Sequence, residues 1–233
     1  MAPSGLHYFP VTLPFLLLLA LLGLVVGMAA MRLLRYASVS MGISLPSLVT
    51  ILALSLLGSY VNIPIAYLPE RETTTLAQIS FFGVTYAVPV VHEWSATVLA
   101  INLGGALIPI AVSLYLMAKN RLWGLSMLGI AIVAVICHWL ARPVPGLGIA
   151  EPVLVPAAAT AFVALLLSRR QAAPLAYVCG SLGTLIGADL LNLDKIRGLG
   201  APVASIGGAG TFDGIFVTGL LAVLYAGLAR YAR

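Results

Sequence analysis

Two aspartates near the C-terminus are the residues of this chain best suited to chemistry. Asp189 falls near the end of the apolar stretch Ala173–Leu193, and Asp213 opens the apolar stretch Phe212–Ala229. Two carboxyl groups that share a low-dielectric site do not both ionise, so one acts as a general base toward water and the other as a general acid. The pattern therefore predicts a diaspartyl hydrolytic site, with two antiparallel helices facing each other across a glycine-rich connection.

Other polar or conformationally permissive residues are expected to support these aspartates. Asn192 follows Asp189 by three residues on the same helix face, and Gly210 and Gly214 leave space around Asp213. Further candidates lie in or next to apolar stretches, where polar side chains are costly to bury and usually face a functional interior. They are Asn62, Asn102, His92, His138 and Glu151.

The same residues fit two other functions. A small transporter or channel would use the acids, the asparagines and broken helices to bind a cation or a polar solute. A metal site built from His92, Glu93, His138, Glu151 and an aspartate has suitable ligand types. It lacks a short spacing such as His-x-x-x-His, so no metal or other cofactor is expected.

Structural roles are also open for the two aspartates. Asp213 is suited to capping a helix N-terminus, where a carboxylate accepts hydrogen bonds from free amides. Asp189 is within reach of an ion pair with Lys195 or Arg197. In either case the residue would stabilise the fold and would not react.

Composition indicates that the whole chain lies in a membrane. Of its 233 residues, 61% are apolar and only 8% are charged, whereas a soluble domain has about 25% charged residues. Apolar runs of roughly 20 residues favour helices, because the bilayer offers no water to backbone groups. We therefore predict a single all-α integral membrane domain over residues 1–233. The lipid bilayer is its expected partner, and nothing indicates nucleic acid.

Seven apolar stretches are expected to span the cell membrane. They are Val11–Met31, Ser44–Leu68, Ser95–Met117, Leu122–Leu140, Pro152–Ser168, Ala173–Leu193 and Phe212–Ala229. Placing the N-terminus outside and the C-terminus inside puts most Lys and Arg residues on the cytoplasmic side, as is typical of membrane proteins. This orientation puts all the acids at the outer side.

Irregular segments accompany these predicted helices. The β-branched and aromatic residues of Ile79–Pro89 predict a short hairpin that caps the outer face. The prolines and glycines of Arg142–Pro156 predict a segment that dips into the membrane. In the predicted sixth span, Ala176, Gly180, Gly183 and Gly187 form a seam of small residues that lets another helix pack closely.

Several segments resemble a known but uncharacterised family. The runs Gly183–Leu193 and Gly200–Gly219, together with Asn102–Pro109 and Pro145–Pro152, are similar to prokaryotic multi-pass membrane proteins that are grouped as a domain of unknown function. This resemblance covers much of the chain and implies no activity.

A looser resemblance concerns presenilin and signal-peptide-peptidase-type intramembrane aspartyl proteases, which pair an aspartate in one helix with a Gly-x-Gly-Asp motif opening the next. It implies catalytic roles for Asp189 and Asp213 and a membrane peptide as substrate. The chain departs from that pattern, because Thr211 and Phe212 separate Gly210 from Asp213. It also has seven predicted helices where those proteases have nine, and no Pro-Ala-Leu motif follows.

Overall fold

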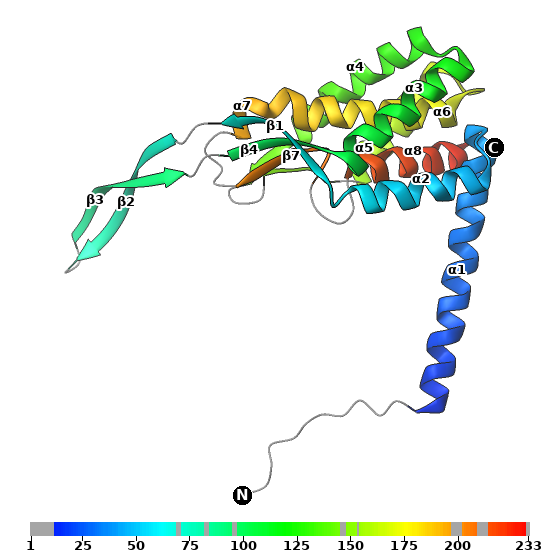
Figure 1. Cartoon of the computed structure of the whole chain (residues 1–233), viewed down its shortest axis with the longest axis horizontal. Coiled ribbons are helices and arrows are strands. Elements are labelled where there is room, and N and C mark those ends of the chain that lie inside the picture. The colour runs from blue at the N-terminus through cyan, green and yellow to red at the C-terminus, as the bar shows by residue number, and fades with distance from the viewer. Residues whose placement is uncertain are drawn as a thin grey trace, which may run out of the picture.

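A computed structural model describes residues 12–68, 71–81, 84–94, 97–144, 148–152, 154–196, 202–208 and 214–231, with residues 71–94 described by their backbone pairing (Figure 1). Most described residues are helical, and a small sheet lies at one end of the helices. The helices are α1 (Leu13–Met41), α2 (Leu45–Gly58), α3 (Ile108–Asn120), α4 (Trp123–Leu140), α5 (Leu154–Leu167), α6 (Ala172–Thr184), α7 (Leu193–Ile196) and α8 (Gly214–Tyr231). The strands are β1 (Asn62–Leu68), β2 (Arg71–Phe81), β3 (Val84–Trp94), β4 (Thr97–Asn102), β5 (Arg142–Val144), β6 (Gly148–Ala150) and β7 (Val203–Ile206).

Helix α6 forms the centre of the helical body. Nearly all of its residues are buried, including Tyr177, which is 1% exposed. The other helices that pack on it are α1, α3, α4, α5 and α8. A helix without charged residues or a polar face is expected to take this central position.

The small-residue seam predicted in this helix is confirmed, although it serves two partner helices. Gly180 faces Gly219 of α8, where an added Cβ would lie 3.0 Å from the Gly219 Cα. Gly183 and Gly187 face α4, and a Cβ at Gly187 would lie 2.2 Å from the carbonyl oxygen of Ala134. These glycines let backbones approach at distances that no side chain would allow.

A three-stranded sheet, which the sequence did not predict, joins distant parts of the chain. Its order is β1-β4-β7, with β1 antiparallel to β4 and β7 parallel to β4. Asn62 pairs with Asn102, and a register shift occurs between Pro64 and Ala66. Proline has no N–H to donate, so within a sheet it is tolerated at an edge or next to such a bulge.

The second and third predicted spans therefore differ from the structure. Ser44–Leu68 is divided into the 14-residue helix α2 and strand β1. Ser95–Met117 begins with strand β4, and a helix begins only at Leu103. Apolar runs without clear periodicity fit a strand as well as a helix, and Pro64 opposes a helix at this point.

Four of the described helical segments are long and apolar enough to cross a membrane. They are Leu13–Met41, Leu103–Asn120, Trp123–Leu140 and Ala172–Ile196. Leu45–Gly58, Leu154–Leu167 and Thr218–Gly227 are shorter apolar segments. A 14-residue helix reaches only about 21 Å, less than the hydrocarbon core of about 30 Å. The long apolar helices fit a membrane protein.

The two predicted irregular segments are both short antiparallel pairs. The hairpin β2–β3 is longer than Ile79–Pro89, since its register runs from Arg71 with Trp94 to Phe81 with Val84. In Figure 1 it extends away from the helical body and does not cap it. Within Arg142–Pro156, strands β5 and β6 pair from Arg142 with Ala150 to Val144 with Gly148.

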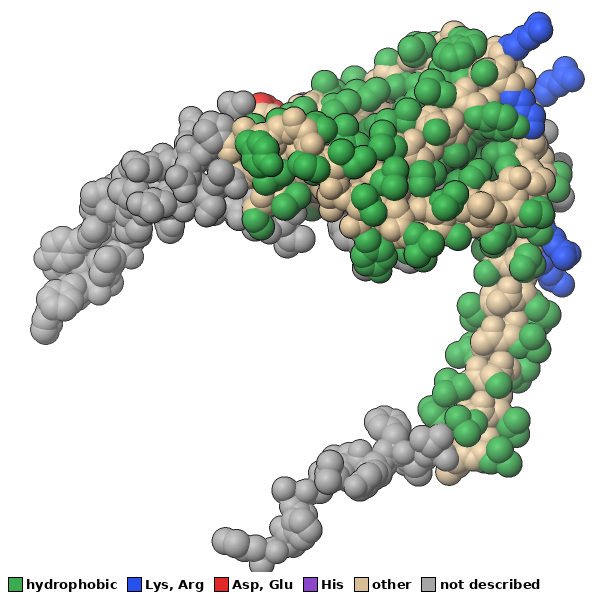
Figure 2. Space-filling view, viewed as in Figure 1, with side chains coloured by type: hydrophobic (Ala, Val, Ile, Leu, Met, Phe, Trp, Pro, Cys, Tyr) green, Lys and Arg blue, Asp and Glu red, His purple; other side chains and the backbone are tan. Residues whose placement is uncertain are grey.

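Helix α1 contacts the rest of the protein only near its C-terminal end. Its buried residues are Ala37, Ser38 and Met41, and the apolar part that precedes them is exposed on all sides. In Figures 1 and 2 this part projects away from the other helices. It ends ten residues after the predicted span, at Met41 where the prediction ended at Met31.

Candidate functional site

Asp189 lies where the central helix changes its winding. Helix α6 continues as a π-helical turn, Leu185–Asp189, and then as a 3₁₀ turn, Leu190–Asn192. A π turn leaves carbonyl groups without their usual i+4 partners, and such turns are frequent at functional sites. The predicted catalytic aspartate is therefore the last residue of a π turn within a helical segment, Ala172–Ile196, that is long and apolar enough to cross a membrane.

Asn192 supplies the hydrogen bonds that this interruption removes. Its Nδ2 donates to the carbonyl oxygens of Gly187 and Ala188, at 2.9 Å each. Its Oδ1 accepts a hydrogen bond of 2.7 Å from Lys195 Nζ. Asn192 is 1% exposed, so it holds the shape of the turn that carries Asp189.

Gly207 provides the described hydrogen bond to the Asp189 carboxylate. Its backbone N–H donates to Asp189 Oδ2 at 2.7 Å. Gly207 directly follows strand β7 and has a φ of +77°, a conformation that favours glycine. The carboxylate is thus tied to the end of a strand, and its described partner is a neutral amide. Lys195, suggested by the sequence as an ion-pair partner, instead donates to Asn192.

Glu151 is a second carboxyl group near Asp189. It follows strand β6 and precedes α5. Burial raises the pKa of Glu151 to about 7, a hydrogen bond with Cys137 opposes this rise, and the charge of Asp189 adds to it. Its Oε1 is buried and has no hydrogen-bond partner among the residues that the structure describes. Glu151 and Asp189 therefore interact electrostatically in a partly desolvated environment.

Cys137 interacts with Glu151 and lies against the turn that carries Asp189. It is fully buried in the last turn of α4, and its Sγ lies 3.5 Å from Thr184 Oγ1 of α6. A Cβ at Gly187 would lie 2.8 Å from the Cys137 Cβ, which shows how closely α4 approaches the π turn. The next residue, His138, has a buried Nδ1 without a hydrogen-bond partner in the described part of the chain.

Asn62 and Asn102 fasten the sheet to the helices beside this cluster. Asn102 Nδ2 donates to Ser59 O and Asn62 Oδ1, while Asn102 Oδ1 accepts from Gly105 N. Ser205 of β7 donates to Asn62 Oδ1 at 2.5 Å. Both asparagines are therefore engaged in the packing of β1, β4 and β7, and their predicted role in binding a substrate remains a prediction.

Several predicted site residues lie beyond this description. Asp213 and Gly210 lie outside the described residues, and Gly214 is the first residue of α8. His92 is in strand β3, where its backbone pairs with Thr73, and the structure describes no more of it. In Figure 1 that hairpin lies away from the end of α6.

The described acids suit proton transfer better than metal binding. No group of three or more His, Cys, Asp and Glu side chains within the described ranges is arranged to hold a metal ion. By contrast, a carboxyl group with a pKa near 7 exchanges protons readily at neutral pH. Glu151 is therefore suited to proton exchange, and the charge of Asp189 acts on it.

Sequence reasoning did not identify Cys137, Thr184 and Gly207 as parts of this site. Cys137 is a free thiol. The sequence carries one signal for Gly207, the pair Gly207-Gly208 after a β-branched run, which is typical of a strand end. Nothing in the local sequence indicates that this strand end meets Asp189.

Comparisons with known proteins identify a family without an activity. A model of the family described as "Protein of unknown function (DUF1614)" matches residues 56–225. No curated protein and no solved structure shows detectable similarity to the chain. The matched range includes every element that contributes to the Asp189 cluster.

Proposed function

This chain belongs to the family of proteins of unknown function (DUF1614), and we propose that it is an intramembrane aspartyl hydrolase that cleaves a peptide in the membrane. The observation that carries this proposal is the hydrogen bond from Gly207 to Asp189. This bond fixes a carboxylate at the end of a strand, inside a protein with long apolar helices. Hydrolysis of a peptide in a membrane requires an acid that is held in place and a binding site for an extended chain.

The proposed second acid is Asp213. Along the chain, the nearest described residues are Gly208 before Asp213 and Gly214 after it. Gly208 follows Gly207, whose N–H donates to Asp189, and Ile215 follows Gly214. Ile215 is 3% exposed and packs in one cluster with Leu185 and Ile206. Asp213 itself lies outside the described residues, so its pairing with Asp189 is part of the proposal. Glu151 is the alternative second carboxyl group.

The proposed substrate would bind as an added strand. Strand β7 pairs with β4 and is one of the two edge strands of the described sheet, with β1 at the other edge. An extended peptide that pairs with the outer edge of β7 would gain backbone hydrogen bonds. It would then pass the end of β7, where Gly207 holds Asp189. This geometry directs a scissile carbonyl group toward the acids.

The proposed reaction uses the two carboxyl groups in opposite protonation states. The ionised carboxylate takes a proton from water, whose oxygen forms a bond to the scissile carbonyl carbon. The protonated carboxyl group stabilises the carbonyl oxygen and then gives its proton to the leaving amine as the C–N bond breaks. The products are a carboxylic acid and an amine, and the site needs no external co-reactant.

We further propose the full membrane topology predicted from sequence, with seven spans, the N-terminus outside and the C-terminus inside. Charge distribution supports this arrangement. The described acids near Asp189 lie at the strand end of the helices, whereas Arg121 follows α3 and Arg169 and Arg170 join α5 to α6 at the other end. Figure 2 shows Lys and Arg side chains at the end of the helical body away from the strands. Since basic residues are retained in the cytoplasm, the acidic site would face outward in the cell membrane.

The test combines cleavage with a probe that needs no natural substrate. Purified protein in lipid vesicles is incubated with fluorescent single-span peptides, and with a photoreactive peptide that carries a hydroxyethylene group in place of the scissile amide. Asp189→Asn and Asp213→Asn should each reduce cleavage by at least about 100-fold. Asp194→Asn removes an exposed acid of α7 and serves as the control. Full cleavage by both aspartate variants, with unchanged folding, rules out the diaspartyl mechanism.

A second candidate is a transporter of a cation or a polar solute. It is favoured by a second interrupted helix, because the π turn Leu103–Leu107 precedes α3 and packs near Leu185 through Ala106. Transporters commonly bind ions where two helices are broken. Solute or proton flux in vesicles that is lost in Asp189→Asn, without any cleavage by the wild type, would select this function.

A further inference from the structure

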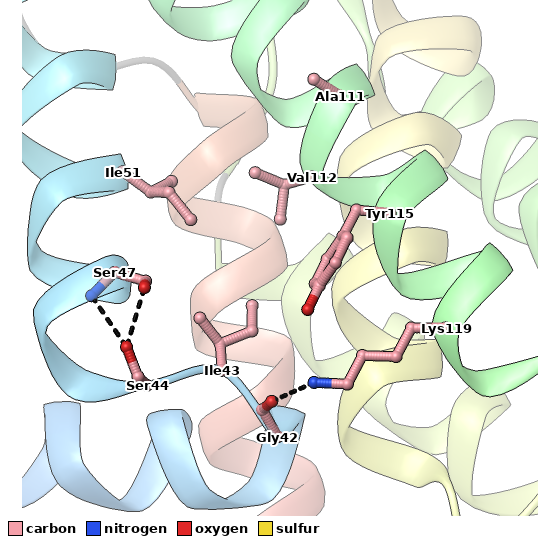
Figure 3. Close-up of a pocket in the computed structure, with 9 residues that line it drawn as sticks. All are labelled: Gly42, Ile43, Ser44, Ser47, Ile51, Ala111, Val112, Tyr115 and Lys119. Atoms are coloured by element: carbon pink, nitrogen blue, oxygen red, sulfur yellow. Dashed lines mark hydrogen bonds between the residues drawn. The ribbon is translucent and has the colours of Figure 1, made fainter.

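A cavity of about 510 Å³ lies at the end of the helical body opposite Asp189 (Figure 3). It opens between the start of α2 and the last turns of α3. Helix α2 leads from here toward the sheet, where Gly58 packs against Gly104. The cavity therefore belongs to the basic end of the protein and shares no residue with the acidic cluster.

A lysine and a tyrosine form one polar side of this cavity. Lys119 Nζ donates to the carbonyl oxygen of Gly42, and it lies 5.4 Å from the centre of the Tyr115 ring. An ammonium group has three donors, and a single acceptor is recorded for it among the described residues. Lys119 is therefore held at the cavity with hydrogen-bonding capacity to spare.

Two serines at the start of α2 form the facing polar side. Ser44 Oγ accepts from the backbone N–H of Ser47 at 3.2 Å, and the two hydroxyl oxygens are 2.7 Å apart. One hydroxyl proton is used between the serines, so the other can be donated to an outside acceptor. The partial positive charge of the helix N-terminus lies at the same place. Lysine, hydroxyl and helix end all favour an anion.

The rest of the cavity wall is apolar. Ile43, Ile51, Ala111 and Val112 line it, and Figure 3 shows Ile51, Ala111 and Val112 farther along α2 and α3 than the polar group around Ser44 and Lys119. Moving along the cavity toward the sheet, the surroundings thus change from cationic to hydrocarbon-like. A free inorganic anion would gain nothing from the apolar part, whereas an amphiphile would use both parts.

We infer that this cavity binds an anionic membrane phospholipid, with its phosphate between Lys119 and the Ser44–Ser47 pair and an acyl chain along Ile51 and Val112. Basic pockets between helices commonly receive lipid headgroups in this way. Among the described residues, no acidic side chain lines the cavity. The charge of Lys119 disfavours a cationic choline group. The inference rests on this cavity alone and is independent of the proposed hydrolase activity.

Native mass spectrometry of the full-length protein in detergent tests this inference. The probes are phosphatidylglycerol and phosphatidylcholine with identical acyl chains, and glycerol 3-phosphate as the soluble counterpart of the headgroup. The wild type should retain phosphatidylglycerol preferentially. Lys119→Gln should weaken this binding by about fivefold. Arg170→Gln, which removes a basic residue outside the cavity, should leave it unchanged.

A second variant keeps the inference testable if Lys119→Gln misfolds. Ala111→Trp places a large side chain in the cavity without changing its charge, and it should also reduce binding of phosphatidylglycerol. Equal retention of the two lipids by the wild type, or unchanged retention by Ala111→Trp, overturns the inference. Displacement of phosphatidylglycerol by glycerol 3-phosphate at equal concentration overturns the lipid as occupant and indicates a site for a soluble phosphate.

Discussion

The Asp189 carboxylate accepts a 2.7 Å hydrogen bond from the backbone N–H of Gly207, 18 residues later in the chain. This bond joins the π turn at the end of α6 to the end of strand β7. Because β7 pairs with β4, the hydrogen bond also links Asp189 to strand β4, which precedes β7 by about a hundred residues. The position of the candidate catalytic group is therefore determined jointly by a helix and by a sheet.

Substitution of Gly207 should disturb this link strongly. In Gly207→Ala the residue would keep a φ of +77°, and its Cβ would lie 2.7 Å from Ala106 Cβ. Left-handed backbone and overpacking each destabilise, so we expect a loss of about 1–3 kcal/mol in the free energy of unfolding. Thermal unfolding in detergent measures this loss.

The matched control for this variant is Gly23→Ala. Gly23 lies in the exposed part of α1, and an added Cβ there meets no atom within 4 Å. Alanine in a helix is favourable, so the melting temperature should stay the same or rise. If Gly207→Ala melts at the same temperature as Gly23→Ala, Gly207 is not held in a left-handed conformation against Ala106.

Loss of the Asn192 side chain should loosen the π turn. Asn192→Ala removes two hydrogen bonds to the buried carbonyl oxygens of Gly187 and Ala188. Leaving such groups unsatisfied costs about 1–3 kcal/mol. Hydrogen exchange of the segment 185–192 should become faster in this variant.

A comparable change at the other end of the protein provides the control. Asn120 Nδ2 donates to a single carbonyl oxygen, that of Leu116, so Asn120→Ala should leave exchange in segment 185–192 at the wild-type rate. Equal exchange in all three proteins would mean that Asn192 does not hold the turn.

The sequence was sufficient to predict the helical membrane character and the position of Asp189 on a tightly packed apolar helix. An aspartate in an apolar stretch beside a seam of glycines indicates an acid shielded from water on a tightly packed helix. Asp189 is partly buried, and Gly187 lies against α4. These predictions succeed because they depend on residues within one helix. Periodicity and burial cost are local properties that a single segment carries.

The sheet and the Glu151 contact could not be predicted in the same way. Strands β1 and β4 lie in apolar runs that predict helices, and the pairing of β4 with β7 joins Val98 to Val203, 105 positions later. Glu151 interacts with both Cys137 and Asp189, which belong to other segments of the chain. Such proximity depends on how helices pack, and no short motif encodes it.

The glycine seam allows a direct test of the packing that brings these groups together. In Gly187→Ala the new Cβ would lie 2.2 Å from Ala134 O and 2.8 Å from Cys137 Cβ. Since both atoms belong to the tightly packed helix α4, we expect a loss of about 1–3 kcal/mol or more. Thermal unfolding should show a lower melting temperature.

The control for the seam is Gly124→Ala, at the start of α4. An added Cβ there meets no atom within 4 Å, so the variant should melt at or above the wild-type temperature. A Gly187→Ala protein as stable as this control would contradict the close approach of α4 and α6.

The raised pKa of Glu151 predicts a specific pH dependence of stability. Burial lifts this pKa from 4.5 to about 7, so the folded protein holds the proton more tightly than the unfolded chain does. The resulting stabilisation is complete below pH 4.5 and is lost as the pH rises to about 7. In Glu151→Gln the group no longer titrates, and the melting temperature should fall less over this interval than in the wild type.

Asp194→Asn, which removes an exposed acid, should keep the wild-type slope of melting temperature against pH. Identical slopes for the wild type and Glu151→Gln would show that Glu151 does not gain a proton on folding, and would remove it as a candidate proton donor beside Asp189.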